Sequence, residues 1–305
     1  MIFKHRQLIS NMEKEYMYIM ISAILFGTII FGGQIFVEMG FSSYEITIFR
    51  LIPGLILLPL IIFKKEYRIT KEMIPTFLAF GFIGSINMIT QYTSLSLGVP
   101  VAIAVFLLYT QPLWTTIFGK LFLKENLTKY KIVAVVLSLI GIGIMIDPFN
   151  IPDIGSLVGI GLAVIAGICL SAWVIYSRKA GLKKYNPVTT TVGYVIFILL
   201  FTILSIPITG SLIQDQTIIR ITIEQPIEIW GYFVIYFIFS TLIPFILFYK
   251  GMQKIQATSA GIVLMLEPIS ASLLAFVLLS QPLTLNILAG GALILISNYL
   301  VIRKK

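Results

Sequence analysis

The sequence predicts an all-α integral membrane protein of ten transmembrane helices, arranged as two inverted five-helix repeats. Three observations predict this class: the composition, the placement of basic residues and an internal repeat. The chain of 305 residues is 58% hydrophobic and only 11% charged, with a mean hydropathy of +0.99. Soluble domains carry roughly 25% charged residues. Polar side chains therefore cannot cover this chain, and its expected surroundings are lipid.

Ten segments are long and apolar enough to cross a bilayer as a helix, which takes about 20 residues. Apolar runs of this length without period-two alternation favour helices over a β-barrel. The first repeat, 16–146, holds segments at about 16–37, 45–63, 73–95, 100–122 and 129–146. The second repeat, 155–302, holds segments at about 155–177, 188–209, 229–250, 257–279 and 284–302.

Local features support the segments in order. In the first repeat, segment two contains IFRLIPGLILLPL, segment three carries polar residues at helical spacing, segment four contains YTQPLW, and segment five contains GIGIM. In the second repeat, segment six contains GIGLAVIAG and ends in SRK, segment nine contains LEP, and segment ten contains LAGG. The glycines favour close helix packing in a membrane. The GIGLAVIAG run is not a dinucleotide fingerprint, because no strand precedes it.

Lysine and arginine alternate between the two sides of the expected membrane. The two tails and the even-numbered loops hold 20 of the 22 basic residues, and the exceptions are Arg50 and Arg220. Basic loops face the cytoplasm, so both termini are expected to be cytoplasmic and the number of spans to be even. The expected location is the cytoplasmic membrane, with the lipid bilayer as the surrounding partner.

The strings YTQPLWTTIFGKLFLKENLT and MLEPISASLLAFVLLSQPLT align without gaps, which places Pro112 on Pro268 and Thr128 on Thr284. Nearer the start of each half the offset is 144 residues, and Arg50 then matches Tyr194. Five spans per unit is an odd number, so the second unit enters from the opposite side. Inverted repeats of this kind are typical of secondary transporters with a binding site at the midplane.

These stretches resemble the drug/metabolite transporter superfamily with two EamA-type repeats. The likeness covers nearly the whole chain, and its most recognisable stretch is FILFYKGMQKIQATSAGIVLMLEPISASLLAFVLLSQPLT. The chain departs from the family pattern in having Phe26-Gly27 in place of Trp-Gly, Gln34 in place of a basic residue, and Gln281 in place of an acid. The resemblance implies transport of amino acids, other metabolites or drugs, commonly outward.

Glu267 is the only charged residue or histidine between Ile255 and Ile302. An acidic residue in a transmembrane segment is costly and usually faces a water-filled cavity or the bundle interior. The following Pro268 lacks an N–H, so a kink with a free carbonyl near Leu264 is expected. Glu267 is the candidate for coupling to a proton or cation. A structural hydrogen bond to another helix is an equally weighted alternative.

Other residues are candidates for a central cavity lined by spans one, three, four, six, eight and nine. Asn87, Gln91 and Ser94 form one polar stripe, for which interhelical glue is the alternative reading. Arg50 is expected to pair with Glu45 or to reach toward the outer surface, and attraction of a substrate carboxylate is the alternative. The remaining candidates are polar or aromatic residues within spans: Gln34, Tyr92, Tyr109, Gln111, Trp114, Trp173, Tyr176, Tyr236 and Ser240.

Several classes of function are disfavoured. No extended basic face suggests nucleic acid, and no cofactor is expected. The single Cys169 and single His5 give no metal cluster. An enzyme would need a nucleophile with a base, or paired acids, within the membrane. The main hypothesis is a transporter of a small-molecule substrate, with a proton or counter-substrate as the coupling partner. The alternatives are a channel or lipid scramblase.

Overall fold

The computed structural model describes residues 2–147, 156–212 and 219–303, without the side chains of residues 2–13, Tyr92, Ser96, Ala102 and Leu212. All regular structure in these ranges is helical, which confirms the all-α class. Nine spans within them are long and apolar enough to cross a membrane: Lys14–Glu38, Ser43–Phe63, Ile74–Leu95, Lys129–Ile146, Leu157–Leu182, Pro187–Ser211, Ile227–Gly251, Ala257–Leu279 and Leu285–Arg303.

The fourth predicted segment, 100–122, is not one continuous helix. It is divided into α5 (Val101–Leu108) and α6 (Gln111–Leu123), with Tyr109 and Thr110 between them. Pro112 stands at the start of α6, where a missing N–H costs nothing. The ninth segment is divided in the same way, into α12 (Ala257–Val263) and α13 (Leu266–Leu279), with Pro268 in the first turn of α13.

Spans two and eight are also divided into shorter helical segments, and the other spans are single helices. Span one is α1 (Ile2–Glu38), and span two is α2 (Ser43–Leu51), a 3-10 segment (Ile52–Leu57) and α3 (Leu58–Phe63). Span eight is α10 (Ile227–Phe237), a π-helical turn (Ile238–Leu242) and α11 (Ile243–Gly251). The unbroken spans are α4 (Ile74–Ser96), α7 (Lys129–Ile146), α8 (Leu157–Leu182), α9 (Pro187–Leu212) and α14 (Leu285–Arg303).

The internal repeat is visible in backbone geometry. Helices α6 and α13 end at Leu123 and Leu279, and the next residues, Lys124 and Ser280, both have a positive φ, of 53° and 55°. The residue after each donates its N–H to an equivalent carbonyl: Glu125 to Gly119 at 3.0 Å and Gln281 to Ala275 at 3.2 Å. The two repeats therefore leave their fourth span by the same turn.

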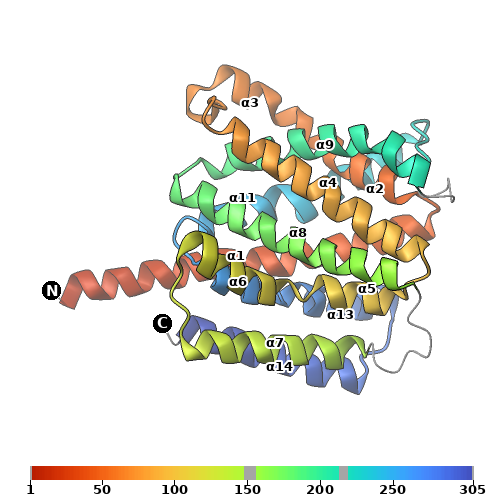
Figure 1. Cartoon of the computed structure of the whole chain (residues 1–305). Helices are drawn as coiled ribbons and strands as arrows, with labels where there is room; N and C mark the ends of the chain where they lie inside the picture. Colours follow the sequence, from red (N-terminus) through yellow and green to blue (C-terminus); the bar gives the residue numbers. More distant parts are fainter. Residues whose placement is uncertain (1, 148–155, 213–218, 304–305) are drawn as a thin grey trace.

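The repeats are interleaved. Helix α1 packs against α11 and α13 of the second repeat, while α8 packs against α4, α5 and α6 of the first. Helices α7 and α14 lie side by side along one flank (Figure 1). Gly141 and Gly290 permit this approach, because a Cβ on Gly290 would lie 2.3 Å from the Gly141 carbonyl oxygen.

Both termini point toward the same end of the bundle (Figure 1). We call this the basic end, because it holds Lys64 to Lys71, Lys124 to Lys131, Lys179 to Lys184 and Lys250 to Lys254. Its loops are tied across the repeats. Lys254 forms an ion pair with Glu15 at 2.7 Å, and Arg178 donates to the Met252 carbonyl at 2.7 Å. The basic end is therefore held together by contacts between separate spans.

Candidate functional site

Glu267 lies in the first turn of α13, just after the break in span nine, and is partly buried. The expected free carbonyl at Leu264 is wrong, because the Glu267 N–H donates to it at 2.9 Å. Pro268 cannot donate to the Leu264 carbonyl, because it lacks an N–H. A tighter turn lets Glu267 donate instead, so the Leu264 carbonyl has a hydrogen-bond partner at the break. What the break does provide is a position for the carboxylate at the junction of two short helices.

The Glu267 carboxylate meets Tyr109, which donates a hydrogen bond to it from its hydroxyl. Tyr109 is itself the residue that ends α5, at the equivalent break of the first repeat. It packs in one cluster with Met265, the residue beside the second break. The two helix breaks therefore face each other, and they bring together a carboxylate and a buried phenol from opposite repeats.

The position of Arg50 differs from the one predicted. It was expected to pair with Glu45 or to reach the outer surface, but the Glu45 carboxylate accepts N–H groups from Ser42 at 2.7 Å and Thr222 at 2.6 Å. The Arg50 guanidinium instead lies 5.8 Å from the centre of the Tyr236 ring, and its charge acts on Glu267 and Tyr194. Its buried Nε has no hydrogen-bond partner among the described residues. Arg50 is an interior cation.

Two aromatic clusters lie on either side of Arg50. The inner cluster is nearer the basic end and consists of Phe26, Phe80, Trp173, Tyr194, Phe245, Phe248 and Tyr249. The outer cluster consists of Phe36, Phe41, Phe49, Trp230, Phe233 and Tyr236. Arg50 interacts with Tyr194 of the inner cluster and Tyr236 of the outer one. Packed rings thus border the charged group on both sides.

The π-helical turn of span eight connects the two clusters, since the outer cluster uses α10 and the inner cluster uses α11. Ser240 is fully buried in this turn, with its hydroxyl 3.4 Å from that of Thr241. Tyr236 donates its hydroxyl to the Ile29 carbonyl at 2.7 Å and lies over Gly32 of α1. π-helical turns are rare and are frequent at functional sites.

The polar stripe of span three faces protein. Asn87 donates from Nδ2 to the Ala166 carbonyl on α8 at 2.8 Å. Ser94 is fully buried, and its backbone lies close to α8, because a Cβ on Gly159 would lie 3.2 Å from the Ser94 carbonyl oxygen. Gln91 is partly buried, and the side chain of Tyr92 lies outside the described residues. At Asn87 the stripe acts as interhelical glue.

The remaining candidates are dispersed. Gln111 is buried and donates to the Thr115 hydroxyl beside Gly261 of α12, so it lies across the repeats. Trp114 donates its indole N–H to the Thr110 hydroxyl at 3.1 Å, and Trp173 donates to the Tyr249 hydroxyl at 3.3 Å. Gln34 forms an exposed bond with Glu38 near the end of α1, away from Glu267.

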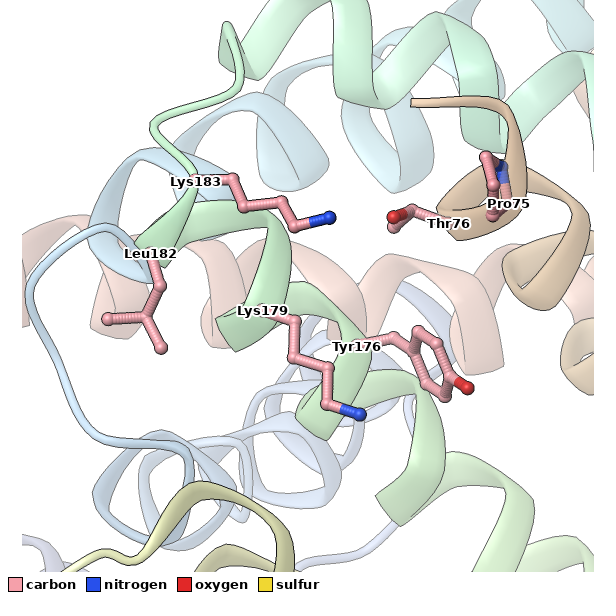
Figure 2. A pocket seen from close by; sticks show the side chains of 6 residues that line it. All are labelled: Pro75, Thr76, Tyr176, Lys179, Leu182 and Lys183. Carbon is pink, nitrogen blue, oxygen red and sulfur yellow. The ribbon is translucent and has the colours of Figure 1, made fainter. Parts of the chain in front are cut away.

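Tyr176 belongs to a separate hollow at the basic end, shown in Figure 2. The hollow has a volume of about 410 Å³ and is lined by Pro75, Thr76, Tyr176, Lys179, Leu182 and Lys183. Lys183 points toward Thr76, and Lys179 lies beside Tyr176 with its Nζ 4.7 Å from the ring centre (Figure 2). This open, basic hollow between α4 and α8 is distinct from the Glu267 group.

Sequence reasoning placed Glu267, Tyr109, Trp173, Tyr236 and Ser240 among the candidates but missed the interior position of Arg50 and the role of Tyr194. A signal existed in the internal repeat, because Arg50 aligns with Tyr194 at the 144-residue offset. In an inverted repeat, residues near the symmetry axis meet their own equivalents. The structure brings these two residues into electrostatic contact.

Comparison with known proteins relates this chain to membrane transporters. The model of the EamA-like transporter family matches residues 13–146 and again residues 157–303. An uncharacterized transporter of Archaeoglobus fulgidus is 26% identical over 78% of this chain and 81% of its own length. The threonine/homoserine exporter RhtA of Escherichia coli K12 is 26% identical over 85% of this chain and 83% of its own length.

A solved crystal structure of another protein has the same fold. It superposes with a TM-score of 0.70 and covers 95% of this chain and 99% of that chain, at 17% sequence identity. At this identity the likeness concerns the fold alone. The ten-segment interleaved bundle is thus an arrangement that the two chains share over nearly their whole lengths.

Proposed function

The chain belongs to the EamA-like transporter family and is a membrane transporter; from this premise we propose that it is a secondary transporter that moves an amino acid or similarly small metabolite across the cytoplasmic membrane by alternating access. The observation that carries the proposal is the group formed by Arg50, Glu267 and Tyr109 in the interior of the bundle. The basic end is the cytoplasmic end in this proposal, by the positive-inside rule.

Charged side chains inside a membrane bundle are costly and are typical of substrate or ion pathways. Arg50 and Glu267 have opposite charges, and the buried Arg50 Nε has no partner among the residues described. A solute with both a carboxylate and an ammonium group would complement the two charges. RhtA, by its name, exports two amino acids, and this supports the same class of solute here.

Transport of such a solute requires a route that opens at one end at a time. The inner and outer aromatic clusters lie between the charged group and the two ends, so each would serve as a barrier. Glu267 is the coupling candidate, because a carboxylate can exchange a proton for the ammonium group of a solute. A proton or a second solute molecule moving in the opposite direction would complete the cycle.

The test is uptake of radiolabelled threonine into proteoliposomes containing the purified protein. Saturable uptake that is accelerated by unlabelled threonine on the opposite side is the expected result, because counterflow requires a carrier that returns loaded. Uptake that is linear in concentration and shows no counterflow would indicate a channel and contradict the proposal. A screen of other amino acids, polyamines and nucleosides in the same vesicles identifies the preferred solute.

The Glu267→Gln variant tests the coupling role. Glutamine preserves the shape of the side chain and an acceptor for Tyr109, so the protein should fold normally. We expect the pH dependence of net uptake to disappear while exchange of labelled for unlabelled solute is partly retained. The matched control is Glu228→Gln, which removes an exposed carboxylate at the other end of the bundle. A Glu267→Gln protein with the wild-type pH profile would assign the carboxylate to packing alone.

A further inference from the structure

Among the residues that the structure describes, Glu125 makes the most extensive buried carboxylate contacts between the two repeats. It follows the αL residue that ends α6 and is 8% exposed. Its two carboxylate oxygens accept the backbone N–H groups of Ala257 at 2.5 Å and Thr258 at 3.0 Å. These are the first two residues of α12. A residue of the first repeat thus caps the short helix that leads to Glu267 in the second.

The surroundings of Glu125 fit this contact closely. Gly119 leaves room for it, because a Cβ there would lie 3.0 Å from the Glu125 carboxylate and 2.8 Å from the Thr258 hydroxyl. Lys131 donates to the Asn126 carbonyl at 3.0 Å and to the side chain of Gln256, the residue before α12. The turn after α6 and the start of α12 are therefore joined by both a carboxylate and an ammonium group.

The repeat provides an internal comparison. Gln281 stands 156 residues after Glu125, at the same position of the turn after α13. By the same offset, the start of α5 at Val101 corresponds to the start of α12 at Ala257. Gln281, however, is exposed, and so is Val101. Among the described residues, the carboxylate contact is therefore formed at the basic end, and the Gln281 side chain forms no equivalent hydrogen bond to the start of α5 at the other end.

We propose that Glu125 is a positioning residue that holds the basic end closed by capping α12. The second repeat has a glutamine, Gln281, at the equivalent position, and the corresponding closure of the other end is therefore weaker. The proposal rests on the alternating access of the proposed function, in which the two repeats exchange conformations. A hydrogen bond to a carboxylate is roughly twice as strong as one to a neutral amide. The chain therefore favours the conformer that is closed at the basic end, the one described here.

The test uses two matched cysteine reporters in purified, solute-free protein with Cys169 replaced by serine. Ala260→Cys in α12 and Ala104→Cys in α5 are 156 residues apart, and both alanines are buried. The rate of alkylation of each reporter measures how often its end of the bundle opens. In the otherwise unchanged background, Ala104→Cys should react faster than Ala260→Cys.

Glu125→Gln should raise the alkylation rate of Ala260→Cys about tenfold, in keeping with the loss of a charged acceptor, and should lower that of Ala104→Cys. Gln281→Glu, far from the basic end, should have the same effect as Glu125→Gln: it should raise the alkylation rate of Ala260→Cys and lower that of Ala104→Cys. Glu66→Gln, which alters an exposed carboxylate at the basic end, should change neither. Only a change in the conformational equilibrium moves the two reporters in opposite directions.

A role of Glu125 in stability alone gives a different result. If Glu125→Gln raises both rates together, or changes only the reporter in α12, or leaves both rates unaltered, the proposal is overturned. The measurement needs no transported solute, so it also separates the two proposals. Reciprocal labelling in a protein that fails the threonine counterflow test would retain the closure mechanism and reject the solute.

Discussion

Gly27 shows how a single residue allows the repeats to interleave. It lies where α1 crosses α13, and a Cβ at this position would come within 2.0 Å of the Ser270 hydroxyl and 2.8 Å of the Ala271 backbone nitrogen. Ser270 in turn donates to the Ile24 carbonyl at 2.9 Å. The approach of α1 to the helix that carries Glu267 is therefore set by an absent side chain and fixed by a hydrogen bond.

Gly27→Ala should destabilise the protein by about 1–3 kcal/mol, because the added methyl group forces α1 and α13 apart. The matched control is Gly161→Ala, since Gly161 is in a helix, is exposed, and has no atom within 4 Å of its added Cβ. Thermal unfolding of the two variants in the same detergent measures the difference. Equal melting temperatures for the two would contradict the close contact at Gly27.

At the scale of the helices, spans four and nine are each made of two short helices. The breaks at Tyr109 and at Leu264 occur at equivalent places, and each is followed by a proline near the start of the next helix. Glu267 is positioned by its break. An unbroken helix would rotate the carboxylate relative to Tyr109 and Arg50.

Pro268→Ala restores a backbone N–H that competes with the Glu267 N–H for the Leu264 carbonyl. The two short helices should then tend to fuse, with a change in stability of about 1 kcal/mol or less but a loss of most threonine transport. Proteoliposome uptake and thermal unfolding of the same preparation measure the two effects. Pro187→Ala, at the start of α9, is the control, and it should leave transport unchanged. Normal uptake by Pro268→Ala would show that the break is dispensable.

Much of this arrangement was predictable. Runs of hydrophobic residues located the spans, and the alternation of lysine-rich loops gave their order, because both are one-dimensional properties of the chain. Pro268 predicted a kink in span nine near Leu264, but not the turn that satisfies the Leu264 carbonyl. The break in span four at Tyr109 and Thr110 was not predicted. Arg50 was misplaced because sequence distance from the end of a span does not say which side chains from other helices surround it. The ring clusters and the cap by Glu125 depend on contacts between repeats, which no single span specifies.

At the scale of the whole molecule, the basic end gathers both termini, and its spans are joined by the Lys254–Glu15 ion pair and by the hydrogen bond from Arg178 to the Met252 carbonyl. Many large apolar side chains on the spans are exposed, as expected for a surface in contact with lipid. The loops at the two ends therefore differ in charge, whereas the surface of the spans between the two ends is largely apolar. This distribution predicts the orientation of the molecule.

Single cysteines at Lys65 and Lys183, in a chain with Cys169 replaced, should be unreactive to a membrane-impermeant maleimide in intact cells and reactive after lysis. A cysteine at Leu285, exposed at the other end, should react in intact cells. The physical reason is the retention of basic loops on the cytoplasmic side during insertion. Labelling of position 183 in intact cells would reverse the orientation.

The interleaving of α1 with α11 and α13 has a consequence for biosynthesis. A ribosome makes this chain from its N-terminus, at about 5–20 residues per second. Helix α1 is thus complete long before Gly251 and Ser270, the residues against which it finally rests, have been made. During that interval Gly27 and the other contact positions of α1 face lipid or the insertion machinery. The first helix made is among the last to find its neighbours, so a nascent chain interrupted after the first repeat would lack the partners of α1.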